Sequence, residues 1–230
     1  MTTTLAATGR ASRRGLGPVI GVHAGLFVGG AVALSLDPPA QGWCVLAVVA
    51  AYAVALLWVC RATGRADLAE LAGFLAIVSV FQVLPDWVLV DVVGTLRFPD
   101  TGGPRFDDAI PLAMAAMWLP PLFIALTLAG GRPGRAALLS ALVFLGAEIL
   151  APTLGLWEPV GGTHRWAGVA LYVVPAEAAL GWAAATAYSL SRRSPLLARV
   201  GAALAVSTFY LGALVMTYFV IDVATWRLTT

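Results

Sequence analysis

Three acidic residues stand in stretches of the sequence that are otherwise almost wholly apolar: Glu148, Glu177 and Asp86. A charged side chain costs roughly 2.5–3.5 kcal/mol at the centre of a bilayer on insertion scales, so such residues usually face a cavity or a partner. Glu148 and Glu177 lie near the middle of their stretches, and Asp86 lies towards the outer end of its own. A desolvated carboxyl without a neighbouring cation keeps its proton near neutral pH and is able to donate it. The three residues therefore predict acid catalysis in an apolar site.

Each of these acids has a structural alternative. Glu148 and Glu177 could form a hydrogen bond between helices without any chemical role. Asp86 could be neutralised by Arg97 or Arg105, which follow it in a loop rich in proline and glycine. No arginine is predicted at the depth of Glu148 or Glu177, and this favours the catalytic interpretation for those two.

Aromatic residues are the second feature of a candidate site. Trp118 and Trp182 lie about halfway along their apolar stretches, which the usual position of tryptophan at the membrane interface does not explain. Aromatic faces carry negative potential and stabilise cations, so an acid beside them suits protonation of an alkene followed by a carbocation. Ordinary packing is the alternative for each ring. The candidate substrate-binding residues are Trp118, Trp182, Tyr188, Trp157 and Asp91.

The sequence predicts no metal and no cofactor. His23 has no cysteine, histidine or carboxylate at ligand spacing around it, and no aspartate-rich motif of the DDxxD kind is present to hold Mg²⁺ and a diphosphate. A retinal Schiff base is excluded because it requires a lysine, and the chain has none. The remaining candidate chemistry depends on the carboxyls alone.

Composition indicates that these residues belong to a membrane protein. The chain has 230 residues, of which 60% are hydrophobic and 11% charged, against about 45–50% and 25% in soluble domains. Seven stretches have roughly the 20 residues that a spanning helix needs. They cover residues 18–36, 41–60, 68–93, 109–130, 136–156, 166–190 and 198–221. We expect an all-α integral membrane bundle of about seven transmembrane helices, in a single domain over residues 18–223.

The arginines predict how this domain is oriented. Ten of the fourteen lie in the N-terminal tail and in the connectors after the second, fourth and sixth stretches. By the positive-inside rule, residues 1–17 form a cytoplasmic tail and residues 224–230 an external one. A cleaved signal peptide is the alternative for the N-terminus, because Arg13 and Arg14 precede an apolar run.

Composition also bears on origin and partners. The absence of lysine, with abundant alanine and glycine, is typical of a GC-rich bacterium, so we expect the bacterial inner membrane. The net charge of +2 and the dispersed arginines predict no nucleic-acid partner. The expected partners are the lipid bilayer and an apolar small molecule.

Two segments of the chain, roughly residues 68–130 and 136–190, resemble each other. Each has an acid, a glycine, an aromatic residue followed by proline, a glycine pair and then Pro-x6-Trp. These residues are Asp86, Gly94, Phe98-Pro99, Gly102-Gly103, Pro111 and Trp118 in the first segment, and Glu148, Gly155, Trp157, Pro159, Gly161-Gly162, Pro175 and Trp182 in the second. We expect two parallel three-helix-type repeats with a site at their interface.

The second segment resembles a known family. Its acid Glu148, the motif Gly155-Leu156-Trp157 and the motif Val174-Pro175-Ala176-Glu177 are similar to the membrane lycopene cyclase domain of carotenoid biosynthesis. The first segment, with Phe98-Pro99 and Pro111-Leu112, looks more like the related carotenoid hydratases. The resemblance covers roughly residues 80–190, and it implies two similar halves with Glu148 and Glu177 as the acidic pair of the second.

The chain departs from the family where the second glutamate of Pro-x-Glu-Glu is replaced by Ala178. We therefore expect a member of the wider group of integral membrane terpene cyclases, which includes enzymes acting on prenylated aromatic or indole compounds. The resemblance thus implies an apolar isoprenoid or prenylated small molecule that enters from the lipid phase.

The leading hypothesis is a membrane-embedded, metal-independent terpenoid cyclase. Glu148 or Glu177 would protonate an alkene or epoxide, the carbocation would cyclise, and the other glutamate or Asp86 would take a proton back. One alternative is a carotenoid hydratase, in which water quenches the cation. The other is a non-enzymatic transporter or assembly protein whose acids relay protons or join helices.

Overall fold

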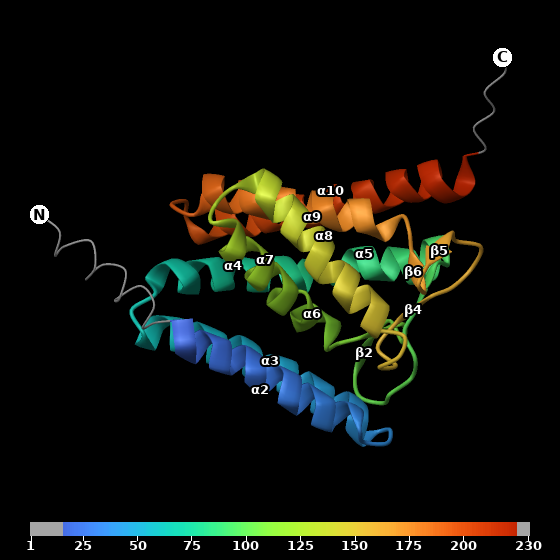
Figure 1. The fold of residues 1–230 in the computed structure, drawn as a ribbon, viewed down its shortest axis with the longest axis horizontal. Coiled ribbons are helices and arrows are strands. Elements are labelled where there is room, and N and C mark those ends of the chain that lie inside the picture. The colour runs from blue at the N-terminus through green and yellow to red at the C-terminus, as the bar shows by residue number, and fades with distance from the viewer. Residues whose placement is uncertain (1–15, 225–230) are drawn as a thin grey trace, which may run out of the picture.

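The computed structural model describes residues 16–224, which form a bundle of helices joined at one end by two long loops (Figure 1). The helical elements are α2 (Leu16–Leu34), α3 (Ala40–Ala62), α4 (Ala66–Phe81), α5 (Val83–Trp87), the π-helical η1 (Val88–Val93), α6 (Met114–Met117), α7 (Leu119–Ala129), α8 (Pro133–Leu150), α9 (Val173–Ser191), α10 (Leu196–Tyr218) and the π-helical η2 (Phe219–Val223). The strands are β1 (Leu96–Arg97), β2 (Arg105–Phe106), β3 (Ile110–Pro111), β4 (Glu158–Pro159), β5 (Arg165–Trp166) and β6 (Val169–Ala170).

Within the described residues, five helices are long and apolar enough to cross a membrane. They are Leu16–Leu34, Ala40–Ala62, Ala66–Val93, Pro133–Leu150 and Leu196–Val223. Two further helical stretches remain. One is Met114–Ala129, which is apolar but shorter, and the other is α9. A mostly helical protein of membrane type is thereby confirmed, while the count of seven spans stays a prediction. The arginines of the predicted N-terminal tail lie outside the described residues.

The fourth and sixth predicted spans begin too early. Residues 109–111 and 166–170 lie largely in short hairpins, β2–β3 and β5–β6, so the helices start only at Met114 and Val173. The fifth predicted span ends too late, because α8 stops at Leu150, two residues before Pro152. Proline has no N–H to continue a helical hydrogen bond and its ring clashes with the preceding turn.

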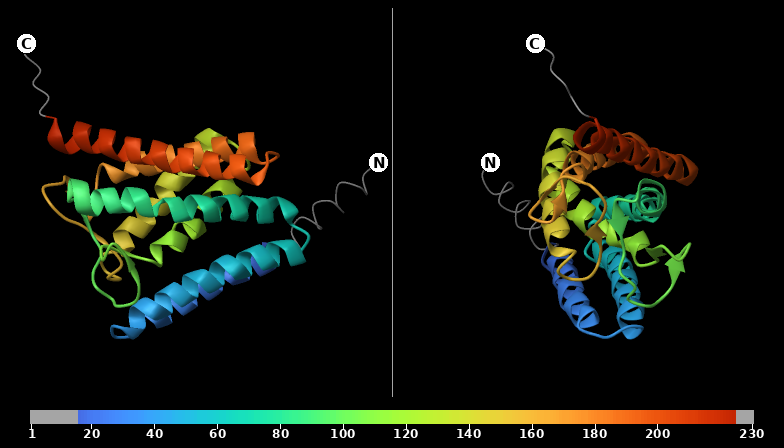
Figure 2. Two further views of the ribbon diagram at one scale, coloured as in Figure 1. Left: turned by 180° about the vertical axis from the view of Figure 1, so that it is seen from behind. Right: turned by 90° about the vertical axis from the view of Figure 1, so that its right-hand side faces the viewer.

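Close packing holds α8 and α9 together at a pair of small residues. A Cβ atom added to Gly181 of α9 would lie 2.1 Å from the Ser140 hydroxyl of α8. Helix α10 packs on α9 and α4, whereas α2 packs chiefly on α3. Figure 2 shows the α2–α3 hairpin and α10 on opposite sides of the bundle, with the hairpin diverging from the remaining helices.

The two long loops pair with each other. Strand β1 of the first loop runs antiparallel to β4 of the second, with Leu96 opposite Pro159 and Arg97 opposite Glu158. The Arg97 guanidinium donates to the Glu158 carboxylate across this pair. Both loops therefore lie at the same end of the bundle (Figure 1), as the sequence predicts.

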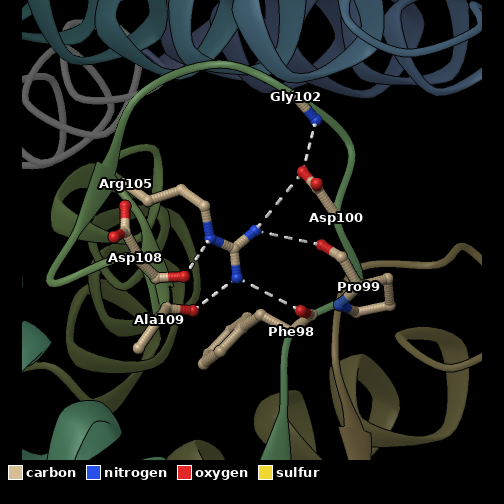
Figure 3. Close-up of polar contacts among 7 residues, drawn as sticks. All are labelled: Phe98, Pro99, Asp100, Gly102, Arg105, Asp108 and Ala109. Carbon is tan, nitrogen blue, oxygen red and sulfur yellow. Dashed lines mark hydrogen bonds and ion pairs between the residues drawn. The ribbon is translucent and has the colours of Figure 1, made fainter.

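Arg105 holds the first loop in shape by donating to four backbone carbonyls (Figure 3). The acceptors are Asp108, 2.9 Å from Nε, Pro99, 3.2 Å from Nη1, and Phe98 and Ala109, 3.2 and 2.5 Å from Nη2. The guanidinium is thereby committed to the loop, and Arg97 is committed to Glu158. Neither arginine is the partner of Asp86, so the structural alternative considered for that acid is wrong.

Candidate functional site

A cavity of about 560 Å³ lies inside the described part of the bundle. Helices α2 and α3 form one wall, α6, α7 and α8 form another, and the first residues of both loops border one end. Most of the lining side chains are aliphatic or aromatic, and no arginine is among them. The volume falls in the range of about 300–1,000 Å³ that is typical of small-molecule sites.

Asp86 reaches this cavity from α5 and is held by an indole. The side chain is 3% exposed, and the Trp118 indole donates from Nε1 to Asp86 Oδ2 at 3.1 Å. Trp118 stands where α6 gives way to α7, just before Pro120 and Pro121 in the first turn of α7. This break allows Trp118 to turn its indole N–H towards α5 while its ring packs against Phe144 and Tyr210, with centroid distances of 5.2 and 5.5 Å.

Glu148 reaches the same cavity from α8, and a second indole holds it. Trp157, nine residues further along the chain, donates from Nε1 to Glu148 Oε1 at 2.9 Å. Both residues border the cavity. Helix α8 ends at Leu150, and this lets the following loop turn back so that Trp157 faces the helix it has just left. Each carboxyl thus has one oxygen fixed by an indole N–H and the other available to a ligand.

Glu177 lies behind this arrangement on α9. It is 1% exposed and is not among the residues that border the cavity. Its Oε2 atom is buried without a hydrogen-bond partner, and its carboxyl interacts electrostatically with that of Glu148. The structural alternative was a hydrogen bond from these glutamates to another helix; the hydrogen bond of Glu148 is to Trp157 of the loop, and Glu177 Oε2 has none.

Two tyrosines that were not among the residues predicted for the site border the cavity. Tyr210 of α10 borders the cavity and is 3% exposed. Tyr172 also borders it, and its hydroxyl forms a 2.8 Å hydrogen bond with Thr95 Oγ1 of the first loop. Tyr210 lies in the last predicted span, beyond both repeats, and no motif distinguishes it from the other aromatic residues there.

The structure places three predicted substrate-binding residues elsewhere. Trp182 is 47% exposed on α9 and packs against Phe209 of α10. It is five residues beyond Glu177, and five residues turn a helix through about 140° beyond one full turn, so it faces outwards. Asp91 is exposed within η1. The third is Tyr188, and neither Trp182, Asp91 nor Tyr188 borders the cavity.

Tyr188 lies at the other end of α9. Its hydroxyl donates to the Asp67 carbonyl at 3.3 Å, and its ring packs on Phe74 with centroids 5.7 Å apart. Both neighbours belong to α4, near the turn opposite the two loops. The expectation that Tyr188 lines a carbocation site is therefore corrected.

The hairpins place the two Pro-x6-Trp motifs at different points of the fold. Pro111 is the last residue of β3, whereas Pro175 already lies in the first turn of α9. Arg105 pairs with Pro111 and Arg165 pairs with Ala170. Trp118 lies seven residues beyond the first of these pairs, and Glu177 lies seven residues beyond the second.

The histidine inside the bundle has ordinary partners. His23 Nδ1 lies 2.9 Å from the Val19 carbonyl and His23 Nε2 lies 3.0 Å from the Tyr52 hydroxyl. Over residues 16–224, no group of three or more histidine, cysteine, aspartate or glutamate residues is placed to hold a metal ion.

The structure is that of a mostly helical protein of membrane type, with an apolar cavity bordered by two carboxyls. The chain belongs to the DUF6989 family, described as a domain of unknown function, whose profile matches residues 83–221. The match includes both carboxyls and Tyr210 but not the α2–α3 hairpin that forms one wall of the cavity. Comparison with curated proteins and with solved structures finds no match.

Proposed function

We propose that this protein is a membrane-embedded, metal-independent cyclase that protonates an apolar isoprenoid and guides the resulting carbocation to a ring. The observation that carries the proposal is the apolar cavity bordered by two carboxyls, each with one oxygen held by an indole N–H. Its lining would accept a hydrocarbon chain, and its carboxyls would supply and recover the proton.

Glu148 is the proposed acid. The carboxyl borders the cavity and has no arginine beside it there, so the neutral acid is the form that costs least in these surroundings. The proton would leave from the oxygen that Trp157 does not bind. As it leaves, the indole N–H stabilises the carboxylate that forms, because hydrogen bonds to ionised groups are stronger than those to neutral ones.

Asp86 is the proposed base. It borders the same cavity as Glu148 but comes from the opposite half of the chain. Its own proton would pass to Glu148 after Glu148 has protonated the substrate. The carboxylate that remains on Asp86 would then remove a proton from the cyclised cation. Trp118, Phe144 and Tyr210 border the same cavity, and the Trp118 ring packs against the other two. Their rings would stabilise positive charge on the substrate. Glu177, which does not reach the cavity, would act through Glu148 as a positioning residue.

We further propose that the chain contains an internal duplication. The order of helix, single strand, hairpin and returning helix occurs twice, over α4 to α7 and over α8 to α9. The two single strands pair with each other, and Asp86 and Glu148 lie ten residues before β1 and β4 respectively. Such repeats place a site at their interface. The proposed setting is a bacterial inner membrane, with the N-terminus in the cytoplasm.

The activity test compares the wild type with Glu148→Gln and Asp86→Asn in a host that accumulates linear isoprenoids. Extracts are separated by chromatography and analysed by mass spectrometry. The control is Glu70→Gln, which removes a carboxyl at an exposed position of α4 that does not border the cavity. All four proteins are checked for equal membrane yield and thermal unfolding.

We expect a product with the mass of the substrate and a shifted retention time, made by the wild type and by Glu70→Gln and lost in the two cavity variants. A gain of 18 mass units would indicate a hydratase instead. If folded wild-type protein converts none of several linear isoprenoids, the cyclase proposal fails and a non-enzymatic role takes its place.

A further inference from the structure

We infer that the cavity opens sideways to the lipid between α2 and α8, and that an uncharged isoprenoid chain enters through this opening. The inference rests on the proposed function for the identity of the chain, but the opening itself is argued from the structure alone.

The opening is marked by residues that both border the cavity and lie on the outer surface. Phe27 of α2 is 71% exposed and Leu150 of α8 is 56% exposed, and both border the cavity. These helices are among the candidate membrane spans, and they have the least buried surface of the five. Their exposed faces therefore meet lipid, and the cavity continues to that surface.

Small residues keep the opening wide. Gly30 of α2 and Gly146 of α8 both border the cavity. A Cβ atom added to either glycine would meet no other atom within 4 Å. The contrast is with Gly181 on α9, where an added Cβ would lie 2.1 Å from Ser140 Oγ. Glycine serves close packing at the α8–α9 crossing, whereas it leaves open space beside the cavity.

The end that faces water is closed by the first loop. Gly42, at the start of α3, donates from its backbone N–H to the Thr101 carbonyl at 2.9 Å. A Cβ atom added to Gly42 would lie 1.7 Å from the Gly102 carbonyl oxygen, so the two backbones are in direct contact. Together with the carbonyls bound by Arg105 and the pairing of β1 with β4, this contact covers the loop end of the cavity.

The lining selects an uncharged ligand. Asp86 and Glu148 are its carboxyls, and no cation among the described residues borders it. A diphosphate or a carboxylate ligand would be buried without a counter-charge, which is strongly unfavourable in an apolar site. Aromatic rings from Trp118, Trp157 and Tyr210 border the inner part and favour an unsaturated, methyl-branched chain over a straight saturated one.

The test narrows the opening and measures loading rather than turnover. Gly30→Trp and Gly146→Trp, called the mouth variants below, place an indole in the opening between α2 and α8. The matched controls are Gly21→Trp on α2 and Gly134→Trp on α8, where an added Cβ also meets nothing within 4 Å but the glycine does not border the cavity. Wild type and variants are reconstituted in nanodiscs, and uptake of tritiated geranylgeraniol is followed over time, with thermal unfolding as the check on folding.

We expect loading to slow by about tenfold or more in both mouth variants and to stay unchanged in both controls, because only the mouth variants obstruct the path to the site. Unchanged loading in the mouth variants would overturn the inference that the ligand enters between α2 and α8. Uptake of octadecanol or of geranylgeranyl diphosphate as readily as geranylgeraniol would overturn the ligand chemistry. Specific loading without any cyclised product would leave this inference standing while the proposed activity fails.

Discussion

Asp86 and Glu148 each lie ten residues before a single strand, β1 or β4, yet each is held in a different way. In the first segment the indole comes from the returning helix, because Trp118 lies 32 residues beyond Asp86. In the second it comes from the adjacent loop, because Trp157 lies nine residues beyond Glu148. Trp118 lies seven residues beyond the last residue of its hairpin, and Glu177 lies seven residues beyond the last residue of the other hairpin.

A neighbouring carboxyl does not distinguish the two acids, because Glu148 interacts electrostatically with both Asp86 and Glu177. What distinguishes Asp86 from Glu148 is the origin of the indole that holds it, which is the returning helix for Asp86 and the adjacent loop for Glu148. Replacing the acids and their indoles therefore tests whether the two carboxyls have separate roles.

The largest effect is expected when the proposed acid is replaced. Glu148→Gln should lower cyclisation by about 10²–10⁴-fold, the usual contribution of a positioned general acid. Glu177→Gln should cost less, because that side chain does not border the cavity. Turnover of each purified variant with one linear isoprenoid measures the difference. A larger loss in Glu177→Gln than in Glu148→Gln would reverse the assignment of the acid.

The indole partners give the next largest effect. Trp118→Phe and Trp157→Phe keep an aromatic ring but remove the N–H that binds Asp86 or Glu148. A hydrogen bond to a charged group contributes about 1.5–3 kcal/mol, so each variant should lose roughly tenfold to a hundredfold in turnover. Trp182→Phe, at an exposed position outside the cavity, is the control and should retain wild-type activity. Equal losses in all three would mean that packing alone is affected.

Substitutions at the α8–α9 crossing test the helix packing that supports Glu148 and Glu177. Gly181→Leu forces a side chain against Ser140 and should destabilise the fold by about 1–3 kcal/mol, as overpacking does in other cores. Gly146→Leu makes the same change where an added Cβ meets nothing within 4 Å and should leave thermal unfolding almost unchanged. Thermal unfolding in nanodiscs measures both. Similar unfolding temperatures for the two variants would contradict the close contact.

The two loops offer a comparison between matching arginines. Arg105, whose side chain is 15% exposed, donates to four carbonyls, whereas exposed Arg165 donates to Gly161 and Thr163. Lysine cannot reproduce the planar fork of arginine. Arg105→Lys should therefore lose about 1–2 kcal/mol of stability through broken hydrogen bonds, and Arg165→Lys much less. Hydrogen exchange of the loop amides would locate the effect. Equal exchange in both variants would contradict the stabilisation of the first loop by the four carbonyls that Arg105 binds.

The smallest effect is expected at the ion pair between the loops. Arg97 and Glu158 are 66% and 34% exposed, and such pairs contribute only about 0–1 kcal/mol because water and salt screen them. Arg97→Gln should shift unfolding slightly at low salt and not at all at high salt. A large shift that persists in high salt would show that the β1–β4 pairing depends on this pair more than its exposure suggests.

The general character of the protein follows from its sequence. Apolar stretches of spanning length can only be helical in a bilayer, since every backbone polar group must be satisfied within the segment. The position of Asp86 and Glu148 among apolar residues identified them as site candidates, because such residues need a cavity or a partner. Both border the cavity. The placing of both loops on one side followed from the alternation of helices and connectors.

The tertiary structure alone decided which aromatic residues accompany these acids. In a membrane helix, the face towards lipid is as apolar as the face towards the core, so the sequence could not distinguish Trp182, which faces outwards, from Trp118, which faces the cavity. The two-residue strands are too short to show a pattern, and so the sequence could not reveal that Trp118 and Glu177 lie at the same distance beyond their hairpins. Tyr210 joined the site only because α10 packs beside α4 and α9. Contacts between distant segments depend on how helices pack, and that packing is determined by the whole chain together.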